Sequence, residues 1–69
     1  MLLKGKTLKG RNRVRELGVQ WRLIRTVERV EFSSESGPWG LVQPVEHGDD
    51  KSRWINLRSD KDFEIIGWP

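Results

Sequence analysis

Cysteine is missing from this chain of 69 residues. Its absence excludes disulfides, thiol catalysis and thiolate metal sites. No apolar run approaches the ~20 residues of a membrane span, and the run Met1–Leu3 is cut off by Lys4, too early for a signal peptide. We therefore expect a soluble, cytoplasmic protein without membrane contact. The length suffices for one small domain, residues 1–69, with a thin core.

Acidic residues are missing from residues 4–15, which read KGKTLKGRNRVR and carry six cations. The net charge of the whole chain is only +3, but it is distributed unevenly. Residues 1–29 hold nine Lys/Arg and two Glu, so 9 − 2 = +7, whereas residues 30–69 hold four Lys/Arg and eight acids, so 4 − 8 = −4. This asymmetry implies a directional electrostatic field, in which the basic half of the chain attracts phosphate.

Histidine occurs once, as His47, in a turn beside Asp49 and Asp50. A catalytic histidine needs a nucleophile and an orienting partner in reach, and the serines of residues 33–36 lie in another loop without a motif. The Asp49-Asp50 and Asp60-x-Asp62 pairs lack the ligand series of a calcium loop, so turn and cap chemistry accounts for them. We expect no enzymatic activity, no metal site and no cofactor.

The triplet Gly5-Lys6-Thr7 matches the end of a phosphate-binding P-loop. A P-loop needs an earlier glycine, a preceding buried strand and a following helix, and only four residues precede Gly5. This motif is therefore dismissed.

Residues 19–31 carry two overlapping apolar patterns. Residues 19–23 alternate apolar and polar as a strand does, the alternation shifts at Ile24, and it resumes at Val30 and Phe32, which indicates a bulge or turn near residues 25–28. The alternative is a helix at about 19–31, because Val19, Leu23, Val27 and Val30 also share one helical face.

Turn-forming clusters divide the rest of the chain into short segments. Strands are expected around residues 6–8 and at 39–45, 53–57 and 63–66. Residues 12–17 are expected to be extended or to form a single turn, which Gly18 ends. Residues 33–38 are expected to form a loop and residues 46–51 a polar turn. Residues 58–62 are expected to form a tight turn, with one turn of 3₁₀ helix capped by Asp60 as an option. Five short strands in one small chain favour an all-β fold, a five-stranded SH3-like barrel. Its expected core is Leu8, Val19, Trp21, Leu23, Leu41, Ile55, Leu57, Phe63 and Ile65.

The basic N-terminal segment, residues 4–15, is the first candidate site. Guanidinium groups match phosphate oxygens and lysines add point charge. In an extended segment Arg11, Arg13 and Arg15 share one face and span about 13 Å, enough to follow a few phosphates. The alternative is a solvated charged face whose Arg stems cover a small core. The predicted nucleic-acid-binding residues are Lys4, Lys6, Lys9, Arg11, Arg13, Arg15, Arg22 and Trp54.

Four tryptophans are present, and strand alternation separates their roles. Trp21 and Trp39 are expected at or beside the core, and Trp68 over an open end of the barrel. If Ile55 points inward, Trp54 and Asn56 point outward. An exposed Trp54 offers a stacking platform for a base or an anchor for a protein partner; a Trp lying flat over a barrel mouth is equally compatible with the pattern.

The stretch Gly5-Lys6-Thr7-Leu8-Lys9-Gly10-Arg11-Asn12-Arg13-Val14 resembles the KOW motif of SH3-like RNA-binding and ribosome-associated proteins, with one extra residue between its Gly-Lys and Lys-Gly pairs and Asn12 near the place of the second glycine. That resemblance implies RNA or ribosome contact through Lys6, Lys9, Arg11 and Arg13. Residues 4–16, together with Arg53-Trp54-Ile55 and residues 60–65, are also similar to small uncharacterised proteins of bacteriophages and bacteria.

The sequence therefore predicts a small non-enzymatic protein that binds nucleic acid, DNA or RNA, through backbone phosphates and largely without sequence preference. The alternative is a protein-interaction adaptor, for example a phage protein that docks on a host factor through Trp54, Trp39 and residues 33–38. A third option is a structural subunit whose charges only solubilise it. The oligomeric state stays open.

Overall fold

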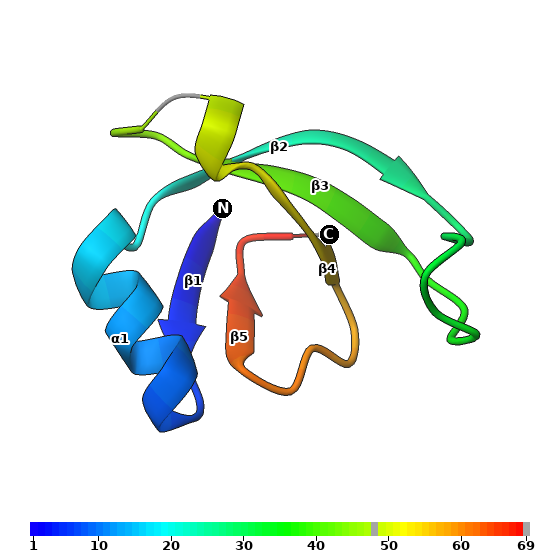
Figure 1. The fold of residues 1–69 in the computed structure, drawn as a ribbon, viewed down its shortest axis with the longest axis horizontal. Coiled ribbons are helices and arrows are strands. Elements are labelled where there is room, and N and C mark those ends of the chain that lie inside the picture. Colours follow the sequence, from blue (N-terminus) through cyan, green and yellow to red (C-terminus); the bar gives the residue numbers. More distant parts are fainter. Residues whose placement is uncertain (48, 69) are drawn as a thin grey trace.

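The computed structural model describes residues 1–47 and 49–68, with the side chain of Asp49 excepted. The elements in chain order are β1 (Leu2–Gly5), α1 (Leu8–Leu17), β2 (Trp21–Val27), β3 (Trp39–Pro44), the 3₁₀ turn η1 (Asp49–Lys51), β4 (Arg53–Asn56) and β5 (Phe63–Ile66) (Figure 1). Among the described residues no helix is long and apolar enough to cross a membrane.

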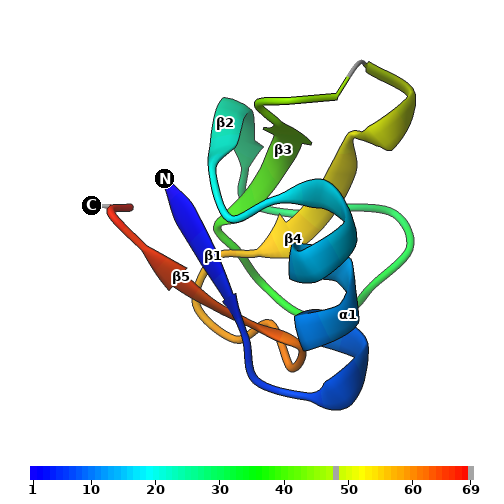
Figure 2. The ribbon, with the colours of Figure 1, turned by 90° about the vertical axis from the view of Figure 1, so that its left-hand side faces the viewer.

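The strands form two antiparallel sheets, β1–β5 and β2–β3–β4. A single bridge, Leu2 to Gln20, connects β1 to the residues that lead into β2. Two flanking bonds, Leu3 N to Val19 O and Trp21 N to Met1 O, both 2.9 Å long, strengthen this junction. The two sheets therefore meet where β1 crosses the start of β2, with α1 beside them (Figure 2).

The prediction of a β-rich fold is confirmed, and the strand over residues 21–27 excludes the alternative helix at 19–31. The register shift between Leu23 and Arg25 explains the break in alternation at Ile24. Two details differ from the expectation. Over the described residues the strands form two sheets and no closed barrel, and one helix is present. The first strand is residues 2–5, not one around 6–8.

Helix α1 occupies residues for which no full helix was expected: a strand was predicted around residues 6–8, and an extended segment or a single turn at 12–17. Thr7 caps its N-terminus, because its hydroxyl accepts a hydrogen bond of 3.0 Å from Gly10 N. Gly18 ends it with φ of +95°, which favours glycine, and its N–H donates to Val14 O. Gly10 and Leu17 are its buried residues, and Val14 is half-buried, so one narrow face packs inward.

The helix lies unusually close to the rest of the chain at Gly10. An added Cβ there would overlap the backbone carbonyl of Asp62, in the turn before β5. Only glycine allows this approach, so the docking of α1 depends on a residue that weakens the helix itself.

The core lies between the two sheets and α1. Trp21, Ile55, Leu57 and Phe63 are buried there as predicted, and Leu23 and Ile65 pack at its border. Three core predictions are wrong, those for Leu8, Val19 and Leu41. Leu8 is 65% exposed on the outer face of α1, and Val19 is 50% exposed because it precedes β2. Leu41 is half-buried on the outer face of β3. Leu3, Leu17 and Val42 are buried in the core cluster instead.

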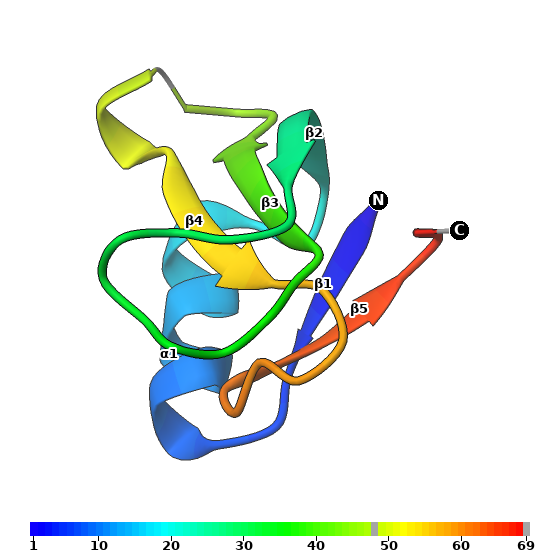
Figure 3. The same ribbon diagram turned by 90° about the vertical axis from the view of Figure 1, so that its right-hand side faces the viewer.

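The loop of residues 28–38 is fastened to the far end of the larger sheet (Figure 3). The indole N–H of Trp39 donates to Glu35 O at 3.0 Å, and Gly37 N donates to Glu28 O at 2.7 Å. Asn56 donates from its amide to Ser36 O at 3.1 Å. Trp39 is consequently only 7% exposed, although it faces away from the core.

Candidate nucleic-acid interface

The arginines of residues 11–15 do not form the single row expected of an extended segment. Helical geometry places Arg11 and Arg15 on one side of α1 and Arg13 about 160° away from Arg11. All three are exposed. The basic segment therefore presents two separate charged surfaces, one on each side of the helix.

Arg13 borders a groove that joins several elements of the fold. The groove measures about 560 Å³ and runs between α1, the edge strand β4 and the loop of residues 28–38. Its cationic and aromatic members come from segments far apart in the sequence. We call it the β4 groove; it is lined by Arg13, Leu17, Phe32, Asp50, Lys51, Ser52, Arg53 and Trp54.

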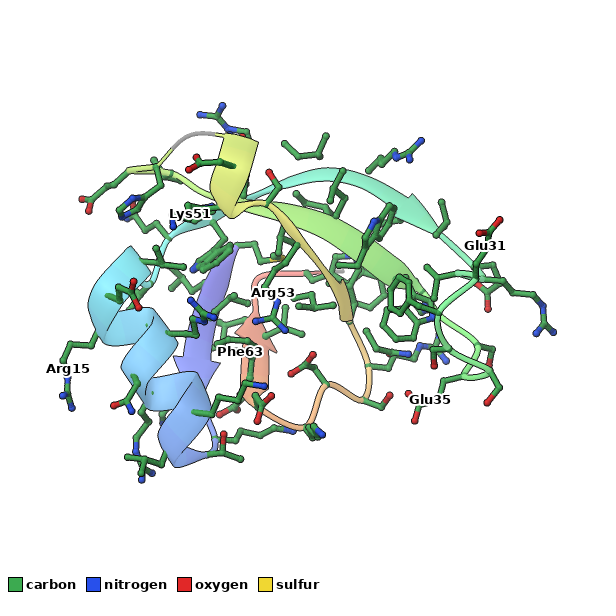
Figure 4. All side chains as sticks on the ribbon, viewed as in Figure 1. Arg15, Glu31, Glu35, Lys51, Arg53 and Phe63 are labelled. Carbon is green, nitrogen blue, oxygen red and sulfur yellow. The ribbon has the colours of Figure 1, made fainter. Side chains whose placement is uncertain are left out.

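Arg53 is the most deeply placed cation of the β4 groove. It pairs in register with Val42 and so projects from the core side of β4, with its guanidinium carbon 5.2 Å from the centre of the Phe63 ring. Figure 4 shows Arg53 directed inward beside Phe63, whereas Arg15 points away from the molecule. The Nε of Arg53 is buried and has no hydrogen-bond partner among the described residues.

Trp54 faces outward, as strand alternation predicts, opposite Leu41 on β3. The guanidinium of Arg25 lies over its ring at 5.4 Å from the ring centre, so one face of the indole already carries a cation. Asn56, expected outward as well, is on the same face of the sheet but only 2% exposed, because residues 33–38 cover it.

Lys4 and Arg11 border a different depression, on the opposite side of α1 from Arg13. It measures about 380 Å³ and is lined mainly by apolar side chains, among them Leu2, Val19 and Ile66. The six predicted cations other than Arg13 lie outside the β4 groove: Lys4 is in β1, Lys6 in the following turn, Lys9, Arg11 and Arg15 on α1, and Arg22 in β2.

The structure thus brings Arg13 and Trp54 together and adds residues that were not predicted. Lys51 and Arg53 complete the cations of the β4 groove, and Arg25 is stacked on Trp54. No local motif marks them. Arg25 reaches the face of Trp54 only because the bulge after Leu23 shifts the alternation. The break in alternation that marks this bulge was the one sequence signal from which the position of Arg25 could have been predicted.

The acidic side chains near these cations reduce the positive charge only in part. Glu16 is 3.9 Å from Arg13 on the surface of α1, a loose contact between side chains that are 63% and 46% exposed. Asp50 is the one acid that lines the β4 groove among the described side chains, against three cations.

The polar residues that were considered for catalysis or metal binding lie in turns. Asp60 accepts hydrogen bonds from Asp62 N and Phe63 N at 2.9 and 3.0 Å. It therefore caps the turn at residues 58–62, which forms without the 3₁₀ helix that was an option there. His47 lies in the turn after β3 and donates its backbone N–H to Pro44 O. The side chain of Asp49 lies outside the described residues. Within them, no group of three His, Cys, Asp or Glu is placed to hold a metal ion.

No protein-family model matches the chain, and no curated protein or solved structure is significantly similar to it.

Proposed function

We propose that this chain is a small non-enzymatic protein of SH3-like architecture that binds nucleic acid through backbone phosphates. The observation that carries the proposal is the β4 groove, where Arg13, Lys51 and Arg53 converge beside Trp54. Clustered guanidinium and ammonium groups bind phosphate largely without reading sequence, and an aromatic side chain adds contact to a base.

The SH3-like part of the proposal is supported by the order of the strands. Hydrogen bonds connect them as β5–β1–β2–β3–β4, with the bridge from Leu2 to Gln20 as the link between the sheets. The first and last strands pair, and α1 fills the connection between β1 and β2. In this arrangement most of the basic segment, residues 6–15, lies in the long first connection of the fold.

The proposed function is tested by titrating fluorescently labelled single- and double-stranded DNA and RNA with the protein at low and at physiological salt. We expect binding whose affinity falls linearly with salt on logarithmic axes. The helix variant, which combines Arg11→Ala, Arg13→Ala and Arg15→Ala, should lose most of this affinity. The absence of binding at low salt would overturn the proposal.

A matched control removes three positive charges elsewhere. Arg29, Arg58 and Lys61 are exposed and lie outside α1 and outside the β4 groove. Their triple alanine variant has the same net charge as the helix variant and should keep most of the affinity. Equal losses in both variants would show that total charge, and no particular surface, determines binding.

A protein-interaction adaptor is the second candidate, and the exposure of Phe32, at 64%, is the observation in its favour. Phe32 lies edge-on to Trp39 with ring centres 5.3 Å apart, beside Trp54 in the β4 groove. Trp39 itself is buried and hydrogen-bonded, which leaves Trp54 and Phe32 as anchors. If the protein is an adaptor, Trp54→Ala should abolish binding of its protein partner, whereas the arginine substitutions should leave that binding unchanged. Nucleic-acid binding predicts instead that the arginine substitutions cause the larger loss.

A further inference from the structure

The β4 groove contains a donor that the described residues leave unsatisfied. The Nε of Arg53 is buried and without a partner there, and a buried guanidinium N–H that lacks an acceptor costs stability. Stacking on Phe63 holds the guanidinium of Arg53 in place. Arg53 as a whole is only half-buried and lines the groove, so an acceptor that enters from solution would meet a guanidinium held in one position.

The surroundings of Arg53 favour an anionic acceptor. Arg13 on α1 and Lys51 on η1 line the same groove, and Asp50 is its one described acid. The three cations come from three elements, so their convergence is a property of the fold and not of a charged run of sequence. A phosphate fits this set, because a guanidinium presents a fork to its oxygens and Lys51 adds point charge.

The aromatic side chains of the groove favour an unpaired base next to that phosphate. Arg25 covers one face of Trp54, which leaves Phe32 as the more open ring. Bases stack on aromatic side chains only when they are free of their complementary strand. A duplex keeps its bases stacked inside and presents phosphates on a stiff outer surface, so it reaches a recessed cation such as Arg53 poorly.

We propose that the β4 groove binds single-stranded nucleic acid, with a phosphate held by Arg53, Arg13 and Lys51 and the adjacent base against Phe32 and Trp54. This inference rests on the proposed function and deepens it, because it selects single strands over duplexes and the groove over the outer face of α1. A contact of this kind reads the backbone and the flat face of a base, so it tolerates many sequences.

The test compares a labelled single strand of about 12 nucleotides with a duplex of the same length. We expect the single strand to bind at least roughly tenfold more tightly. Phe32→Ala should weaken single-strand binding roughly tenfold, since it removes a stacking contact. Lys51→Ala should weaken it and lower the salt slope by about 0.7. Both residues are exposed, so these variants are expected to fold.

Two control variants match the chemistry of these changes outside the groove. Lys61→Ala removes an exposed cation, and Ile24→Ala removes an exposed apolar side chain of β2. Both should bind the single strand as the unaltered protein does. A second readout is the Nε–Hε NMR signal of Arg53, assigned by its loss in Arg53→Lys, which should shift when the single strand is added.

The outcomes separate the two proposals. If no oligonucleotide binds at low salt, the proposed function and this inference both fail. If duplex and single strand bind equally, and Phe32→Ala and Lys51→Ala match their controls while the helix variant loses affinity, the proposed function stands and the groove is overturned as the site. An Arg53 signal that stays unchanged at saturation overturns the phosphate contact.

Discussion

The hydroxyl of Thr7 donates a hydrogen bond of 2.8 Å to the carboxylate of Asp62, across 55 residues of sequence. The same hydroxyl accepts from Gly10 N and thereby caps α1. A backbone hydrogen bond connects the same two segments, since Lys6 N donates to Asp62 O at 2.8 Å. The start of the basic helix is thus fastened to the turn that leads into β5, and this contact sets where the cations of α1 point.

Replacing Thr7 by Ala should destabilise the protein by roughly 1–3 kcal/mol. The substitution removes the helix cap and also leaves the carboxylate of Asp62, a residue 8% exposed, without this donor. Denaturant unfolding followed by tryptophan fluorescence measures the change. Thr7→Ser keeps the hydroxyl and should retain most of the stability; if both variants unfold alike, the hydroxyl has no such role.

Gly10→Ala should destabilise the protein although alanine is the better helix former. The added methyl group meets the backbone carbonyl of Asp62, so the helix has to move away from the turn, at a cost of about 1–3 kcal/mol. Asn12→Ala is the matched control, because Asn12 is exposed on the same helix and should gain a few tenths of a kcal/mol. Thermal melts of both variants should therefore shift in opposite directions.

These contacts explain why α1 could not be predicted from the sequence. Gly10 and Asn12 are poor helix formers, and no acid in the first turn stabilises the helix dipole. The inward face consists of Gly10, Val14 and Leu17, and a glycine is not recognised as an apolar position. What stabilises this helix is its docking on Asp62, far away in sequence.

Strand positions were more predictable, because they depend on local alternation and on turn residues. The strand at residues 63–66, the loop at 33–38, and the outward position of Trp54 follow from these patterns. The β4 groove does not follow from them. It joins Arg13 with Lys51 and Arg53, about forty residues later, and only the tertiary fold brings such segments together.

Asn56→Asp should release the loop of residues 28–38 while the turn after β4 persists. The side-chain oxygen of Asn56 accepts from Arg58 N and Ser59 N, and an aspartate keeps these two bonds. Its second oxygen cannot donate to Ser36 O and faces that carbonyl with a negative charge. We expect faster hydrogen exchange in residues 33–38 and a loss of roughly 1–3 kcal/mol. Unchanged exchange in the loop would contradict this account.

Glu16→Gln should strengthen the binding of nucleic acid. Glu16 is 3.9 Å from Arg13 on the surface of α1, so it competes with phosphate for that guanidinium. Because such exposed pairs are weak and screened by salt, we expect a gain of roughly two- to fivefold at low salt that shrinks as salt is raised. Glu28→Gln is the control, since it removes the same charge from an exposed position outside the β4 groove. A gain specific to Glu16→Gln would show that Arg13 contacts the phosphates, whereas equal gains in both variants would show that only the net charge of the protein matters.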